Sequence, residues 1–373
     1  MIIPFLANML DTLKLQLNDK DIEIFQPSWF FPHAHSLRNV RGFAKSVNNP
    51  TRTDFLQNKY MPRLTYLTRG GKRYLTIEFS APKLIYGENL SEVEDTQFEE
   101  LIDILQSKVR SMGVNVTSVA LKKAPVLALH PSKNIKLKDG YTSSYIISEL
   151  SKVNIDKRLD LAKYRFVNGK GSSLQFHTKQ HSFVIYDKVA DLNAPKSKAI
   201  DKDKINFQRD LFSEIKETKK YFEVIRFEIR ICARSKLKVI LEKLGYVGPL
   251  EFQDLFKKEL CQKILYYYWT KYFLTANLFL FDIESSPQKQ LANIKTVYPD
   301  MKLKQIAYLL GVRQLCLDSG GIMGLRGLIS TNEWQATKKS MTVLNEAVKG
   351  TYSFVEHINQ ELLDFNKFTY KIN

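Results

Sequence analysis

Two segments of the chain alternate between apolar and polar residues over most of their length, and both predict half-buried β-strands. They cover residues 10–17 and 224–231. Side chains of a strand point alternately to its two faces, so each segment presents one apolar face to a core and keeps one polar face. The apolar positions are Leu13, Leu15 and Leu17 in the first segment and Ile225, Phe227, Ile229 and Ile231 in the second.

The first half of the chain also predicts a hairpin, a helix and a further strand. Residues 63–80 read as two strands around a Gly-Gly pair, which supplies the positive φ angles of a tight turn. Apolar residues at helical spacing predict a helix over residues 98–112, and Gly113 ends it. Residues 114–121 predict the next strand.

The same order recurs in the second half of the chain. Residues 172–188 predict two paired strands, and residues 207–222 carry apolar side chains at helical spacing before the strand at 224–231. From Gly245 onward, with Pro249 marking a boundary, the pattern becomes helical and apolar.

These patterns predict an α+β fold in which an antiparallel sheet carries helices on one face. The sheet would consist of two similar hairpin-helix-strand halves, at about residues 9–135 and 160–245, followed by an α-helical C-terminal domain. The predicted domains are therefore residues 9–245, which would carry the chemistry, and residues 246–373.

The composition points to an anionic partner. The chain has 373 residues, with 56 Lys and Arg against 39 Asp and Glu, and a formal net charge of +17. An excess of this size suits binding to nucleic acid.

The three cysteines are widely spaced, form no zinc or redox motif and suit a reduced, cytoplasmic setting. We recognise no secretory leader, and the apolar run at 264–281 contains Lys271, which predicts a buried helix rather than a membrane span.

The polar faces of two predicted strands carry residues suited to phosphodiester chemistry. Tyr186 and Lys188 share one such face, and Arg226, Glu228 and Arg230 share the other. On an open sheet face, charged residues are ordinarily just solvated. A phenol, two guanidiniums and an ammonium around one carboxylate, however, form a set that can hold a phosphodiester and a divalent cation.

A tyrosine nucleophile needs a nearby cation, because a phenol with a pKa of about 10 is almost wholly protonated at neutral pH. Mg²⁺ or Mn²⁺ bound by Glu228, with Glu78 as a second carboxylate, would supply that charge. Lys188 would stabilise the phenolate or the pentacoordinate phosphorus. The residues expected to contact DNA are Arg226, Arg230, Lys14 and Lys170.

Several segments of the chain resemble the filamentous-phage gene II replication proteins and their plasmid relatives. They follow the family's order over roughly residues 9–245 and include Phe-Val-Ile-Tyr-Asp-Lys and Val-Ile-Arg-Phe-Glu-Ile-Arg-Ile. These two segments are also similar to the wider class of rolling-circle plasmid initiators with a single active tyrosine. The matching segments are residues 9–17, 77–89, 130–135, 183–188 and 224–231.

The resemblance implies an endonuclease that nicks one strand of origin DNA, forms a 5′-phosphotyrosyl bond, leaves a 3′-OH primer and later rejoins the strand. It implies that Tyr186 is the nucleophile, that Lys188 is its neighbour, and that Glu228 is a metal ligand between Arg226 and Arg230. Such an enzyme would act in the cytoplasm of a bacterial host. The chain has no Walker pattern, so a host helicase would separate the strands for a host DNA polymerase.

One departure from the family leaves a different function open. Relatives often carry an acidic residue where this chain has Lys122-Lys123. A chain that lacks that ligand could be a DNA-binding initiator or regulator that has kept the fold and lost the nicking activity.

A second set of residues would give the same reaction through another site. His33 and His35 have the spacing of two metal ligands on a strand, and Tyr268 and Tyr272 lie one helical turn apart, as paired nucleophiles would. Pro32 interrupts strand pairing before the histidines, and the tyrosines fall in an aromatic-rich run. A histidine loop and a core helix are therefore the favoured interpretation.

Overall fold

The computed structural model describes residues 10–32, 43–51, 54, 57, 59–138, 140–151, 173–193, 223–274, 286–319, 322–347 and 353–368. The strands within these ranges are β1 (Leu10–Asn18), β2 (Ile22–Ile24), β3 (Phe31–Pro32), β4 (Phe43–Asn48), β5 (Arg63–Arg69), β6 (Lys72–Ser80), β7 (Val114–Val116), β8 (Val126–Lys136), β9 (Ser173–His177), β10 (His181–Asp187) and β11 (Val224–Ile231).

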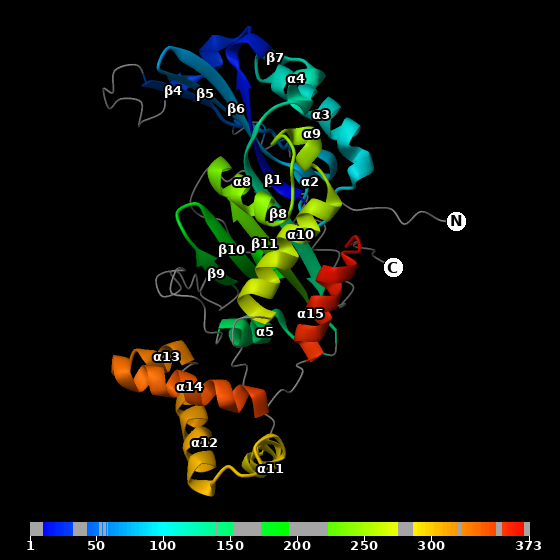
Figure 1. Cartoon of the computed structure of the whole chain (residues 1–373). Helices are drawn as coiled ribbons and strands as arrows, with labels where there is room; N and C mark the ends of the chain where they lie inside the picture. The colour runs from blue at the N-terminus through cyan, green and yellow to red at the C-terminus, as the bar shows by residue number, and fades with distance from the viewer. Residues whose placement is uncertain are drawn as a thin grey trace.

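Nine of these strands form one antiparallel sheet in the described part of the chain. Their order is β3-β4-β5-β6-β1-β8-β11-β10-β9, which places β1 and β8 at the centre of the sheet, with β11 next to β8. The strands β2 and β7 pair with each other in a separate two-stranded sheet. Strands from the first and second halves of the sequence therefore meet in the middle of one layer (Figure 1).

Helices and short 3₁₀ turns connect and cover the strands. The 3₁₀ turns are at Asp19–Asp21, Pro27–Trp29 and Asp95–Gln97. The helices are α2 (Ala81–Tyr86), α3 (Phe98–Ser111), α4 (Ser118–Lys122), α5 (Ser143–Ser151), α6 (Lys188–Asn193), α8 (Arg234–Lys243), α9 (Phe252–Leu255), α10 (Lys258–Trp269) with a π-helical extension (Thr270–Leu274), α11 (Pro287–Val297), α12 (Leu303–Asp318), α13 (Ile322–Arg326), α14 (Thr331–Ala347) and α15 (Ser353–Asp364).

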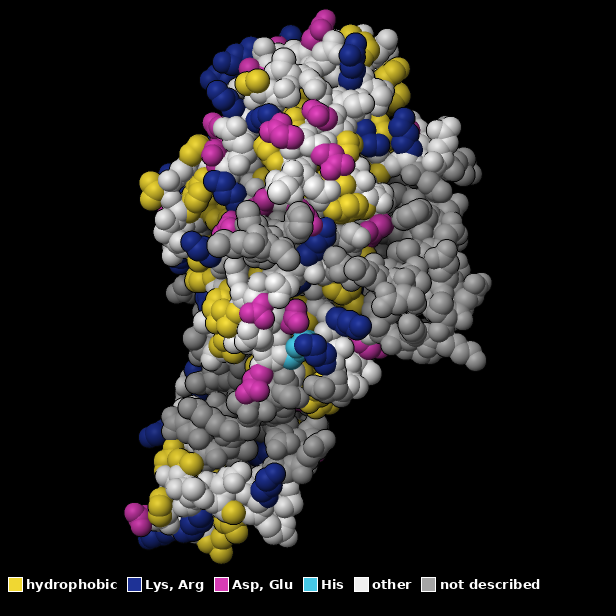
Figure 2. Space-filling view, turned by 90° about the vertical axis from the view of Figure 1, so that its right-hand side faces the viewer, with side chains coloured by type: hydrophobic (Ala, Val, Ile, Leu, Met, Phe, Trp, Pro, Cys, Tyr) yellow, Lys and Arg dark blue, Asp and Glu magenta, His cyan; other side chains and the backbone are white. Residues whose placement is uncertain are grey.

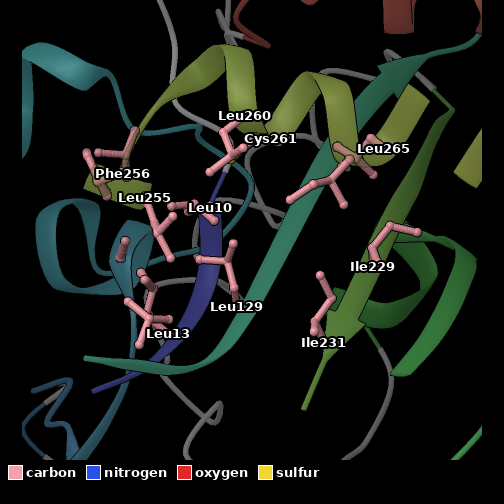
Figure 3. Packing of buried hydrophobic residues seen from close by; sticks show 14 of the residues in the cluster. Leu10, Leu13, Leu129, Ile229, Ile231, Leu255, Phe256, Leu260, Cys261 and Leu265 are labelled. Atoms are coloured by element: carbon pink, nitrogen blue, oxygen red, sulfur yellow. The ribbon is translucent and has the colours of Figure 1, made fainter. Parts of the chain in front are cut away.

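The main core lies between the apolar face of the sheet and the helices that cross it. Leu260 and Leu265 of α10 face Leu129 of β8 and Ile229 of β11 (Figure 3). The helices α8 and α15 contact the same central strands. Because β11 alternates, its apolar side chains on the side of α10 leave Arg226, Glu228 and Arg230 on the opposite face of the sheet.

In the described part of the chain, a second core is formed by buried residues of α11, α12, α13 and α14. Its buried residues are Ile294, Ile306, Leu309, Val312, Cys316, Leu325, Trp334, Met341 and Leu344. The helices α9, α10 and α15 instead bury Phe252, Trp269 and Ile358 in the core of the sheet. The apolar faces of α9 and α10, which follow residue 245, thus complete the first core.

The strands and turns with the strongest sequence patterns are confirmed. Residues 10–17 and 224–231 form β1 and β11, and the predicted helix at 98–112 is α3. The hairpin β5–β6 turns at the Gly-Gly pair, whose φ angles are 56° and 74°. Gly113 follows α3 with a φ of 84°, and a Cβ there would lie 2.5 Å from the Cβ of Gln26.

Two expectations about the first half differ from the structure. Residues 114–121 do not form one strand, since β7 ends at Val116 and α4 begins at Ser118, where Thr117 Oγ1 accepts a hydrogen bond from Ala120 N. Because β7 pairs with β2 rather than with the main sheet, the structure does not confirm two similar halves. The predicted helix at 207–222 lies outside the described residues.

The sequence pattern did not predict β8, although it is one of the central strands. Its sequence has Pro131 in the middle and two polar residues, Lys133 and Asn134, where a buried strand normally carries apolar ones. Both are nonetheless buried, at 1% and 2% exposure, because Glu92 accepts hydrogen bonds from Lys133 Nζ and Asn134 N.

The apolar run that begins at Ile264 is buried as predicted, in so far as the structure describes it. Ile264, Trp269 and Phe273 are fully buried under the sheet. Among the described helices, none combines the length and the apolar character that a membrane span requires.

Candidate functional site

The polar sides of β10, β11 and β8 meet on the face of the sheet opposite α10. Tyr186 pairs with Arg226, and Arg226 pairs with Asn134. One step along, Glu228 pairs with Ser132. This register places the predicted tyrosine and glutamate on the same face, on neighbouring strands.

The Tyr186 hydroxyl donates a hydrogen bond to Glu228 Oε2 at 3.2 Å. The ring is partly buried, and Lys188 Nζ lies 5.7 Å from its centroid. Burial raises the pKa of Tyr186 well above its ordinary value; the Arg226 guanidinium opposes this effect, and the Glu228 carboxylate adds to it. In this state the phenol is protonated at neutral pH and is held by a carboxylate acceptor.

Glu228 is a buried carboxylate surrounded by cations. Its side chain is 4% exposed, Arg230 Nε lies 2.8 Å from Oε1, and Arg226 Nε lies 3.9 Å from Oε2. His130 Nδ1 lies 3.9 Å from Oε1. Burial favours the protonated acid, but Arg230 and then Arg226 outweigh it and hold the pKa of Glu228 well below its usual range. Glu228 is therefore ionised, and its charge is already balanced.

Arg226 does not lie at the surface, where it was expected to bind a DNA phosphate. The residue is 1% exposed, and Nη2 lies 3.0 Å from Asp11 Oδ2. It also donates to Ser132 Oγ at 2.8 Å and to the carbonyl oxygen of Asn89 at 2.7 Å. With Nη1 and Nη2 engaged in this way and Nε buried without a hydrogen-bond partner among the described residues, Arg226 connects β11 to β1, β8 and Asn89 inside the protein and does not present its guanidinium to DNA.

Asp11 is a site residue that the sequence analysis missed. Strict alternation would place it with Leu13 on the apolar face, but the register of β1 against β8 shifts between Leu10 and Thr12. Such a bulge turns a side chain away from its regular face, and Asp11 accepts a hydrogen bond from Ser80 Oγ at 2.9 Å as well as pairing with Arg226. The available signal was a carboxylate at an apolar position of a strand.

Lys188 lies beside Tyr186 as predicted, but for a different structural reason. The strand β10 ends at Asp187, and Lys188 is the first residue of α6. Its Nζ donates to Asn89 Oδ1 at 2.9 Å and lies 3.4 Å from Asp191 Oδ2. Burial and the nearby Arg226 lower the pKa of Lys188 to about 8.

Glu78 and Glu228 are not brought together. Glu78 pairs with Lys14, and Lys14 pairs with Ala128 of β8, whereas Glu228 pairs with Ser132. Along β8, the partner positions Ala128 and Ser132 are four residues apart, which is about 13 Å. Across the sheet, β6 and β11 are three strand spacings apart, which is about 14 Å. One ion with oxygen ligands at about 2.1 Å therefore does not reach both carboxylates.

The described residues do not fit a divalent cation at this position. Glu228 is paired with Arg230, and Glu78 lies 3.9 Å from Lys14 Nζ. In the described part of the chain, no cluster of three or more His, Cys, Asp or Glu side chains is arranged to hold a metal ion. A cation at Glu228 would first have to displace a guanidinium.

Two of the four residues expected to contact DNA are partly exposed. The side chain of Arg230 is 38% exposed and that of Lys14 is 39% exposed. Lys170 lies outside the described residues. Among the described residues on the side shown in Figure 2, Lys and Arg are interspersed with Asp and Glu and form no single basic patch.

The competing tyrosines are core residues. Tyr268 and Tyr272 are 2% and 4% exposed and pack against Phe183, and burial raises the pKa of Tyr268 above its ordinary value. His33 and His35, which would complete that site, lie outside the described residues.

Lys122 is the first of the two lysines at the position where the related proteins were expected to carry an acidic residue. Its ammonium pairs with Glu99 of α3 at 2.7 Å. It belongs to α4, whose Leu121 is buried in the core on the helix-covered side of the sheet. An acidic residue here would lie on the side of the sheet opposite Tyr186.

No family model matches the chain, and no curated protein matches it. A solved structure of a rolling circle replication initiator protein from Geobacillus stearothermophilus is similar to this chain, with 10% sequence identity and a TM-score of 0.33. The match covers 71% of this chain and 85% of that chain. Residues of the two chains cannot be equated at this level of likeness.

Proposed function

We propose that the chain is a rolling-circle replication initiator that nicks and rejoins one strand of origin DNA through Tyr186. The observation that carries the proposal is the Tyr186 hydroxyl, 3.2 Å from Glu228 Oε2, with Arg230, Arg226 and Lys188 around the pair. The segments that resemble replication initiators contain these same residues. The proposal includes action in a bacterial cytoplasm together with a host helicase and DNA polymerase.

The reaction begins when the Tyr186 oxygen attacks a phosphorus atom of the DNA backbone. A bond from phosphorus to the tyrosine oxygen forms, and the bond to the 3′ oxygen breaks. The phenolic proton passes by way of Glu228 to the leaving oxygen, which becomes the 3′-OH primer. The reverse attack by a 3′-OH rejoins the strand and releases the phenol, so no nucleotide cofactor is consumed.

Substrate binding supplies the activation that the resting site lacks. Arg230 is the partly exposed cation of the cluster, and a DNA phosphate competes with Glu228 for its guanidinium. When Arg230 turns to the phosphate, Glu228 loses its main electrostatic partner and becomes a better acceptor for the Tyr186 proton. The buried Arg226 and Lys188 stay in place and stabilise the phenolate.

The test is formation of a covalent protein–DNA adduct on supercoiled DNA that carries the replicon's origin. Tyr186→Phe should abolish the adduct and the open-circle product. Tyr308→Phe, at a tyrosine that is 52% exposed, should change neither, and nor should the double variant Tyr268→Phe with Tyr272→Phe. An adduct that persists in Tyr186→Phe would overturn the assignment. Repeating the wild-type reaction in EDTA, Mg²⁺ and Mn²⁺ tests the predicted cation separately.

A second candidate function rests on the resting state of the same site. The Tyr186 phenol has a raised pKa, and Glu228 is neutralised by two arginines. If DNA binding leaves Tyr186 protonated and Glu228 paired with the arginines, the protein binds the origin as an initiator but does not nick it. Origin binding with no adduct under any cation, in wild type and Tyr186→Phe alike, would establish that function.

A further inference from the structure

A loop between α2 and α3 crosses the candidate site and contacts both buried cations. We call residues 87–94 the site loop. The carbonyl oxygen of Asn89 accepts a hydrogen bond from Arg226 Nη1 at 2.7 Å, and its side-chain oxygen accepts one from Lys188 Nζ at 2.9 Å. A single residue of the loop thus contacts both buried cations of the candidate site, Arg226 and Lys188.

The site loop is held from its other end by a segment far away in the sequence. We call residues 365–368, which follow α15, the strap. Glu92 Oε2 accepts a hydrogen bond from Phe368 N at 2.7 Å and lies 3.3 Å from Lys133 Nζ. Lys133 Nζ also donates to the carbonyl oxygen of Asn366 at 2.6 Å. Lys133 and Glu92 are 1% and 4% exposed, so loop, strap and β8 share one buried ion pair.

The direction of the strap is fixed where it leaves α15. Phe365 is fully buried and has a φ of 48°, a left-handed conformation that a bulky residue rarely adopts. Such a conformation persists only where the surrounding packing enforces it. Ile358 and Leu362 of α15 supply that packing in the main core, where α15 lies beside α10 (Figure 1).

We propose that Asn89 is a positioning residue for the reaction of Tyr186, and that the strap holds the site loop so that Asn89 keeps Lys188 and Arg226 beside the phenol. The inference rests on the proposed function for its consequence in nicking. Its structural part, the hold of the strap on the surroundings of Lys188, is measurable without any DNA reaction.

Lys188 reports on the site loop because Asn89 of that loop accepts a hydrogen bond from its ammonium. The charged groups near its ammonium are Arg226 of β11, Asp191 of α6, Asp11 of β1 and Lys83 of α2. Burial is the largest influence and lowers its pKa from 10.5 to about 8. A loosened site loop admits water, which favours the charged amine, so the pKa of Lys188 should rise toward 10.5.

The experiment removes one hydrogen bond of the strap and keeps a matched control. Phe368→Pro lacks the N–H that Glu92 accepts, whereas Phe368→Leu keeps it. The pKa of Lys188 is measured by competitive acetylation with acetic anhydride across pH, read by mass spectrometry, because only the neutral amine reacts. We expect the reactivity profile to move to higher pH in Phe368→Pro and to match wild type in Phe368→Leu.

Variants of Asn89 test the contact of the site loop with Lys188. Asn89→Asp places a carboxylate on Lys188 and should move its reactivity profile to higher pH, and the pH profile of adduct formation should move in the same direction. Asn89→Ala should slow adduct formation about tenfold, as expected for a lost positioning contact, with an unchanged Kd for origin DNA. Lys122→Ala, which removes an ion pair on α4, is the control and should leave both profiles unchanged.

The outcomes separate this inference from the proposed function. A wild-type chain that forms no adduct overturns the nicking proposal, while the acetylation profiles still decide whether the strap acts on Lys188. Profiles that coincide in wild type, Phe368→Pro and Asn89→Asp would overturn the inference even if Tyr186 nicks DNA.

Discussion

Replacing Asp11 by asparagine removes the carboxylate that lies 3.0 Å from the guanidinium of Arg226. The two residues are 7% and 1% exposed, so water does not replace the lost partner. Removing one member of a buried pair costs about 3–5 kcal/mol, but Arg226 keeps Ser132, the Asn89 carbonyl and, at 3.9 Å, Glu228. We therefore expect Asp11→Asn to lower the stability of the sheet by about 1.5–3 kcal/mol, the contribution of a hydrogen bond to a charged group.

The assay for Asp11→Asn is native-state hydrogen–deuterium exchange of amides in β8 and β11. These amides report opening of the sheet separately from the core of α11–α14. Glu242→Gln is the matched control, because Glu242 and Lys238 form an exposed pair 3.8 Å apart and such pairs contribute at most about 1 kcal/mol. If Asp11→Asn cost no more than this control, the charge of Arg226 would be balanced without Asp11, and the assignment of Asp11 to the site would be refuted.

Two further predictions concern pH and salt. Burial, with Lys236 and Lys271 nearby, lowers the pKa of His181 from 6.5 to about 4, so the folded state binds this proton less readily than the unfolded state. The stability that the neutral imidazole contributes is present above pH 6.5 and is lost as the pH falls from 6.5 toward 4; His181→Gln should flatten this part of the Tm–pH curve, and an unchanged slope would contradict the linkage. Arg230→Ala should reduce the salt dependence of DNA affinity by about one counterion, whereas Lys238→Ala, on α8, should not; equal slopes in wild type and Arg230→Ala would remove Arg230 from the DNA path.

The sequence predicted correctly those strands and turns whose conformation follows from their own local residue pattern. Alternation alone located β1 and β11, and the Gly-Gly pair located the turn of the β5–β6 hairpin. Parity also placed Tyr186 and Glu228 on one face, and the antiparallel register then brought their side chains into contact. These features follow from the period of a strand, which the sequence shows directly.

The rest of the site depends on segments that meet only in the folded chain. Asp11 pairs with Arg226 because a bulge in β1 turns its side chain to the polar face of the sheet. Asn89 contacts Arg226 because the site loop crosses that face. The strand β8 has no clear alternation, since Glu92 satisfies the buried polar groups that interrupt it. Hydrophobic periodicity carries no information about such long-range polar partners, so the burial of Arg226 was also missed.

The charges of the cluster bear on the nucleophilic role that we propose for the buried Tyr186 phenol. Arg226, Arg230 and Lys188 face the carboxylates of Asp11, Glu228 and Asp191. In a set balanced in this way, burial raises the pKa of the Tyr186 phenol, and the opposing effect of Arg226 does not offset it. In the proposed reaction, a phosphodiester adds one negative charge beside the partly exposed Arg230, so that reactivity depends on the substrate. Without DNA, the raised pKa of Tyr186 keeps its phenol protonated.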